Sequence, residues 1–237
     1  MTVSRSRAPR SAISDVAAVG GELPAHVLRV LHAEIATGRW PRGSKIPTWT
    51  ELSAELRVGR STIREAVSTL VHLGMLRPNR GRGTVVSARS AIPGVLTSFT
   101  DQHSVAELLQ VERALEVEAC RLAALHPTDA DLDILTEARR RGTQRDCRHP
   151  VSGRFHAAVF EAARTPLLTD LYEGIEARLR ARGGTVPSQP DGIFATNQQH
   201  GAMLAAIING DSAGAAVAAA AHARAVESTV VTRRQPG

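Results

Sequence analysis

Apolar residues recur at intervals of three and four positions in three short segments near the start of the chain. The segments are residues 24–38, 48–57 and 59–70, and this spacing places their apolar side chains on one face of a helix. Thr48 and Glu51 have the spacing of a capping box, so the second segment is expected to begin a helix there. The link to the third segment is very short, which is typical of a helix-turn-helix.

The pattern changes after the third segment. The stretches "MLRP" and "TVVSA" have the character of short strands, and the glycine-rich "NRGRG" between them has the character of a turn. Three helices followed by a hairpin predict a winged helix-turn-helix domain, to which we assign residues 23–90.

The remainder of the chain keeps helical periodicity throughout. Breaks fall at proline and glycine positions, and no run from residue 91 onward indicates a strand. We therefore predict a mostly α protein in which residues 91–230 form an all-helical bundle of six or seven helices. Residues 1–22 are predicted to be a disordered arm, and residues 231–237 a tail.

The charge of the chain is unevenly distributed. Residues 1–90 hold 14 Lys and Arg against 6 Asp and Glu, a net charge of +8, and the rest carries −2, which together make the +6 of the whole chain. A basic domain joined to a near-neutral one favours nucleic acid as the partner of the first. The arginines at residues 139–141 are expected to complement the dipole at the end of a helix and to lie in water.

Hydropathy bears on the place of the protein in the cell. No apolar run is long enough to cross a bilayer, and the first residues contain no compact apolar core like that of a signal peptide. We expect a cytoplasmic protein with no membrane partner.

Polar residues occupy the first turns of the third predicted helix, opposite its apolar stripe. They are Arg60, Ser61, Thr62 and Arg64. In a winged helix-turn-helix this helix enters the major groove with its N-terminal residues first, where Arg can pair with guanine and Ser or Thr can reach a base edge or phosphate.

The hairpin adds a second candidate contact with DNA. Arg80 stands beside Gly81, whose missing side chain lets the backbone approach the minor groove or the phosphates. A solvated basic face explains any single arginine equally well. It does not explain the helix order, the wing and the charge asymmetry together, so we predict that the domain binds double-stranded DNA.

Three of the nine histidines have suggestive positions. His200 and His222 flank the break at residues 209–211 at similar distances, so an antiparallel helical hairpin turning there brings both imidazoles to nearly the same level. His156 on an earlier helix supplies a possible third nitrogen, and three imidazoles suit zinc, nickel or another divalent transition metal. Histidines that merely pack or face solvent are the alternative.

Residues 38–86 resemble the DNA-binding domain of the GntR family of bacterial transcription regulators. The matching motifs are G-x-x-x-x-G-x-x-[LI]-P, R-[ST]-[ST]-[VIL]-R-E-A, L-x-x-x-G-[ML] and G-R-G-T-x-V. The resemblance implies operator contacts by Arg60, Ser61, Thr62, Arg64, Arg80 and Gly81. Thr50 stands where the family often has a DNA-contacting Arg. Because one recognition helix touches too few bases for a selective site, we expect a homodimer on a palindromic operator.

The helical remainder is similar to the effector-binding and dimerisation domain, called FCD, of the FadR branch of that family. The resemblance implies a divalent metal held by His156, His200 and His222, with a small carboxylate effector beside it. The family's Asp ligand, four residues before the first histidine, is Ser152 here, and an Arg often found in the pocket is Glu112. Arg113 and Arg154 are the candidate effector-binding residues.

The sequence therefore predicts a transcriptional repressor, not an enzyme, whose operator binding responds to a small molecule. One alternative is a constitutive dimeric regulator whose effector pocket has decayed. A metal-dependent hydrolase is the other, but it needs a general base, and no Asp or Glu near the three histidines is an evident candidate in the sequence.

Overall fold

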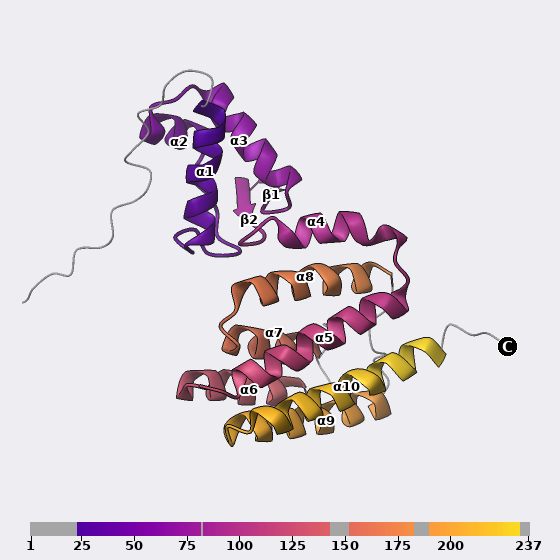
Figure 1. Cartoon of the computed structure of the whole chain (residues 1–237). Coiled ribbons are helices and arrows are strands. Elements are labelled where there is room, and N and C mark those ends of the chain that lie inside the picture. Colours follow the sequence, from indigo (N-terminus) through magenta and orange to yellow (C-terminus); the bar gives the residue numbers. More distant parts are fainter. Residues whose placement is uncertain (1–22, 82, 143–151, 183–189, 233–237) are drawn as a thin grey trace, which may run out of the picture. The chain divides into compact units, whose positions relative to one another are not determined.

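The computed structural model describes residues 23–81, 83–142, 152–182 and 190–232 (Figure 1). The predicted arm and most of the predicted tail lie outside these residues. The chain divides into two compact units between Val95 and Leu96, and each is described separately.

The first unit has the predicted order of three helices and a hairpin. Its elements are α1 (Leu23–Ala36), α2 (Trp49–Leu56), α3 (Arg60–His72), β1 (Leu76–Asn79) and β2 (Gly83–Val86). The apolar faces of the three helices and the inner residues of the hairpin form one buried core. The winged helix-turn-helix fold is confirmed.

Local sequence signals explain where α2 and α3 begin. The hydroxyl of Thr48 accepts a hydrogen bond from the backbone N–H of Glu51, and the carboxylate of Glu51 accepts one from the backbone of Thr48, so the predicted capping box is present. Arg57 ends α2 with a φ of 55°, in the left-handed region that favours glycine. Gly59 then caps α3 in an extended conformation.

The wing is more than a two-stranded hairpin. β1 and β2 pair antiparallel, with Leu76 opposite Val86. The segment before α2 joins them, because the backbone N–H of Ile46 donates to Thr84 and that of Gly43 donates to Val86. Residues 43–46 therefore fix the base of the wing to the body of the domain.

The described part of the second unit is entirely helical, apart from its connections. From residue 92 onward the helices are α4 (Ile92–Phe99), which crosses the division, α5 (Val105–Ala123), α6 (Asp129–Gly142), α7 (Ser152–Ala162), α8 (Pro166–Ala181), α9 (Pro190–Ile208) and α10 (Ser212–Thr232), with a 3-10 turn at Thr100–Gln102. These seven α-helices agree with the predicted six or seven.

Helix α5 is the centre of the bundle. It packs most extensively against α10 and also contacts α7, α8 and α9. Ala119 of α5 and Ala215 and Ala219 of α10 are fully buried, and small side chains at such positions let two helices approach closely. None of the described helices is both long and apolar enough to cross a membrane.

Candidate functional site

The exposed face of α3 carries the predicted DNA-contacting residues. Arg60, Ser61 and Arg64 are exposed and Thr62 is half-buried, whereas the apolar stripe of the helix lies in the core. Burial of the stripe fixes the rotation of the helix, so the two arginines, one turn apart, project from the same side. This exposed side is the one that the sequence predicts to meet a major groove.

The tip of the wing is also exposed. Arg80 and Gly81 are both open to solvent, and Gly81 has a φ of +75°, which only glycine adopts without strain. Lys45, exposed on the segment that joins the wing, has its side chain against Gly83. Sequence reasoning missed Lys45, because its proximity to the wing depends on the pairing of residues 43–46 with β2.

Three histidines from three helices meet inside the second unit. His156 of α7, His200 of α9 and His222 of α10 are all buried, and their candidate ligand atoms lie within 4.8 Å of one another. The Nε2 atoms of His156 and His200 are 2.9 Å apart. The ring centroids of His200 and His222 are 4.7 Å apart, so the predicted alignment across the α9–α10 hairpin is present.

The imidazoles of this cluster are neutral near pH 7. Burial lowers the pKa of His200 to about 3 and that of His222 to about 4, and burial together with the other two rings lowers the pKa of His156 well below 6.5. A neutral imidazole keeps one nitrogen lone pair, which is what a metal ion binds. The cluster can therefore hold a divalent metal.

Two further side chains touch the cluster. Oε1 of Glu116, on α5, lies 3.0 Å from Nδ1 of His156, and Glu116 is only 3% exposed. Oε1 of Gln199 lies 2.9 Å from Nδ1 of His222. The sequence offered no evident acidic residue near the histidines, because Glu116 is 40 residues from His156 in the chain and only the packing of α5 on α7 brings them together.

More acidic residues lie on the same side of α5. Burial and the nearby Glu176 raise the pKa of Glu112 to about 7, although Arg180 partly opposes this. Burial and Glu112 raise the pKa of Glu116 well above 4.5. The position at which many family members have an arginine thus holds a desolvated carboxyl group.

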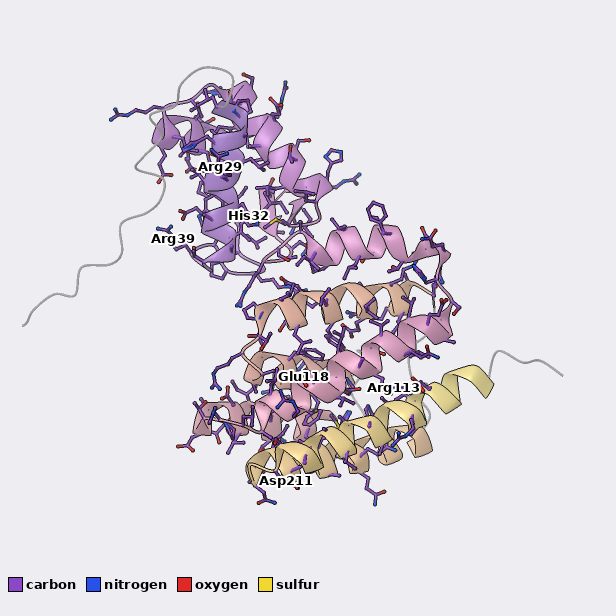
Figure 2. The ribbon with its side chains drawn as sticks, in the orientation of Figure 1. Arg29, His32, Arg39, Arg113, Glu118 and Asp211 are labelled. Atoms are coloured by element: carbon purple, nitrogen blue, oxygen red, sulfur yellow. The ribbon has the colours of Figure 1, made fainter. Side chains whose placement is uncertain are left out.

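The arginines of this unit differ in what they contact. Arg113, labelled on α5 in Figure 2, pairs with Glu227 of α10 at 3.1 Å, and Arg154 is exposed. Arg139 is half-buried, and a Cβ atom added to Gly201 of α9 would lie 2.8 Å from its guanidinium. The expectation that Arg139 lies in water was therefore wrong; the interhelical contact of α6 with α9 covers it.

Ser152 stands at the position where the family has an Asp ligand. Ser152 begins α7, one turn before His156, but its side chain lies outside the described residues. The assignment of this position to the metal site stays a prediction.

Comparison with known proteins identifies the class of this protein, which combines a winged helix-turn-helix with a helical bundle that contains the three histidines. Residues 23–86 match the family described as bacterial regulatory proteins, gntR family, and residues 107–225, about half of the chain, match the FCD domain. The chain belongs to the GntR family of transcription regulators and has a C-terminal FCD domain.

Its relatives cover most of its length. LutR of Bacillus subtilis is 25% identical over 209 residues, which span 83% of this chain and 95% of LutR. The galactonate operon transcriptional repressor of Escherichia coli is 26% identical over 206 residues, 81% of this chain and 90% of the repressor. A solved structure, Streptococcus agalactiae GntR, has a TM-score of 0.64 at 23% identity and covers 87% of this chain and 99% of its own, which shows a shared fold.

These relatives are regulators and not enzymes. The protein is a DNA-binding regulator of transcription whose C-terminal domain is of the effector-binding type.

Proposed function

We propose that this regulator is a repressor whose affinity for a palindromic operator is set by a small carboxylate bound at a metal centre in the helical unit. The observation that carries the proposal is the convergence of three buried, neutral imidazoles from α7, α9 and α10. Buried polar rings of this kind are costly unless they bond to something, and a divalent metal satisfies all three at once.

The donor set fits a transition-metal ion. Zinc binds imidazole nitrogen at about 2.0–2.1 Å, which separates the nitrogens of two ligands by roughly 3.3 Å. Nε2 of His156 and Nε2 of His200, 2.9 Å apart, are within hydrogen-bond distance of each other, and a metal ion between them would need only a small separation of the rings. Zinc and nickel both accept imidazole readily, and a bound dication would supply a Lewis-acidic point that attracts a carboxylate.

We propose Arg139 as a further residue that anchors the effector. Its positive charge acts on His200, and its one hydrogen bond among the described residues is a long one, 3.4 Å, from Nε to the backbone oxygen of Asn197. A guanidinium has five N–H donors and prefers a carboxylate that it can bind with two of them. Arg113 is less suited, because Glu227 already neutralises it.

The effector class follows from the same chemistry. A carboxylate can satisfy both a dication and the Arg139 guanidinium, and one relative is named for the galactonate operon. Galactonate and other small hydroxycarboxylates are therefore the first compounds to test.

In the first unit, Arg60, Ser61, Thr62 and Arg64 are proposed to contact base edges and phosphates in the major groove, and Arg80 and Gly81 to contact the backbone or minor groove. A homodimer doubles these contacts on an operator of matching two-fold symmetry. Because phosphate contacts release counterions, operator affinity should fall steeply with salt. A footprint without an inverted repeat contradicts the dimer.

Elemental analysis after dialysis tests the metal centre. We expect wild type to retain close to one equivalent of zinc or nickel, His200→Ala to retain far less, and the exposed-histidine control His126→Ala to match wild type. Ser152→Asp should hold the metal more tightly than wild type, since an anionic ligand favours a dication. Equal metal in wild type and His200→Ala refutes the site.

Thermal shift of the zinc-loaded protein tests the effector. Galactonate or a related hydroxycarboxylate should raise the melting temperature of wild type and raise that of Arg139→Gln much less, because a charge-assisted hydrogen bond is worth about 1.5–3 kcal/mol. Arg141→Gln is the matched control, since Arg141 is exposed and pairs with Glu137. If no carboxylate shifts a metal-loaded protein that binds its operator, the constitutive regulator is the better description.

A further inference from the structure

Each imidazole has two ring nitrogens, and the three rings differ in what the nitrogen that faces away from the centre of the cluster contacts. His156 faces His200 through Nε2, so its Nδ1 points away from the centre, toward Oε1 of Glu116 at 3.0 Å. His222 has its Nδ1 2.9 Å from Oε1 of Gln199, which leaves Nε2 as its ligating nitrogen. Two of the three rings thus have an oxygen acceptor on the side opposite the candidate metal.

This arrangement decides which nitrogen holds the proton. A neutral imidazole has one N–H and one lone pair, and an oxygen that accepts from Nδ1–H leaves the lone pair on Nε2. Metal-ligating histidines in proteins almost always donate their other N–H to a carboxylate or carbonyl in this way, and the acceptor fixes the tautomer and the ring orientation.

We propose that Glu116 and Gln199 are positioning residues of the metal centre, each holding one histidine with its Nε2 lone pair directed at the ion. The inference rests on the proposed function, in which His156, His200 and His222 bind a divalent metal. Glu116 also places a carboxyl group beside a centre whose usual aspartate position is Ser152.

The surroundings of Glu116 support this role over a purely structural one. Its Oε1 atom is fully buried and accepts no aligned hydrogen bond from the described residues, and such an oxygen is costly to bury. The His156 ring needs only to turn Nδ1–H toward that oxygen for the hydrogen bond to form, since the two atoms are already 3.0 Å apart. Among the described residues this carboxyl oxygen has no other partner, which is explained by a ring that it orients.

The test measures zinc affinity by competition with a chelator. We expect Glu116→Leu and Gln199→Leu each to bind zinc about 10-fold or more weakly, in line with losses of 10- to 100-fold when such acceptors are removed. Glu116→Gln and Gln199→Glu keep an acceptor oxygen and should bind zinc more tightly than the two leucine variants. The matched controls are Glu118→Leu on α5 and Gln198→Leu on α9, both at exposed or partly exposed positions, and they should change nothing.

A spectroscopic readout separates positioning from simple loss of structure. In the cobalt(II)-loaded protein, the exchangeable imidazole N–H protons of ligating histidines give strongly shifted NMR signals. We expect the Nδ1–H signals of His156 and His222 to exchange slowly in wild type, the first to exchange rapidly in Glu116→Leu, and the second in Gln199→Leu. Glu116→Leu should unfold at no lower denaturant concentration than wild type, since it removes a buried unpaired carboxylate.

The outcomes distinguish the inference from the function on which it rests. Zinc affinity and N–H exchange that are equal in wild type, Glu116→Leu and Gln199→Leu overturn the positioning role and leave the metal centre intact. A cobalt spectrum in which Glu116→Leu loses a ligand but keeps slow exchange makes Glu116 a direct ligand, which also overturns it. Failure of wild type to bind zinc, nickel or cobalt refutes the metal centre itself.

Discussion

Removal of the charge at Glu112 should stabilise the helical unit, and only at higher pH. The pKa of this carboxyl is raised to about 7 from 4.5, mainly because burial penalises the ionised form. In the unfolded chain the carboxyl ionises near 4.5. Folding therefore binds a proton between these two values, and the stability present below pH 4.5 is lost as the pH rises through 7.

The size of the effect can be bounded from the structure. A pKa difference from 4.5 to about 7 corresponds to at most about 3 kcal/mol at pH 8. Glu112 is half-buried, so solvent screening reduces this, and we expect about 1 kcal/mol. Glu112→Gln keeps the shape of the side chain and removes the ionisation.

Urea unfolding at pH 5 and pH 8 measures this difference on protein freed of metal by chelation. Glu112→Gln should be more stable than wild type by about 1 kcal/mol at pH 8, and by much less at pH 5. The control is Glu118→Gln on the same helix (Figure 2), whose partner Arg121 lowers the pKa of Glu118, so no gain is expected at pH 8. If wild type is instead the more stable at pH 8, Glu112 is an ionised partner of Arg180 and the reasoning from burial is refuted.

Further tests concern the first unit. Arg64→Ala should weaken operator binding by about 1–3 kcal/mol if its guanidinium pairs with guanine, and Arg60→Ala should do the same, with unchanged circular dichroism. Arg139→Ala, assayed by mobility shift without effector, should bind DNA as wild type does; equal binding by all three variants refutes the assignment of the recognition helix. Gly94→Ala should lower thermal stability by about 1–3 kcal/mol, because its new Cβ would lie 2.5 Å from the backbone oxygen of Leu73; a melting temperature equal to that of wild type contradicts this close contact.

Most of the first unit could be predicted from local patterns. The capping box at Thr48, the apolar stripe of α3 and the glycine-rich turn each act over a few residues. The helices and the hairpin that they specify can therefore be predicted from the sequence. The charge asymmetry and the family motifs then identified this unit as DNA-binding. The position of Lys45 beside the wing was not predictable, because it depends on a pairing between segments about 40 residues apart.

The histidine cluster was partly predictable. His200 and His222 follow from the regular rise of two helices joined by a short turn, a relation that counting along the chain reveals. His156 lies on α7, and it was a candidate third ligand from its residue type and helix, which the resemblance to a known family then supported.

Only the tertiary structure decided what surrounds these histidines. Glu116 reaches His156 because α5 packs at the centre of the bundle, and Arg139 is half-buried because α6 packs against α9. Periodicity shows that a helix has a buried face, but not which helix covers it, since many partners would bury the same apolar area. The sequence by itself thus determined the elements, the DNA-binding unit and the class of regulator, whereas the choice of helix neighbours decided which charged groups stand at the candidate metal centre.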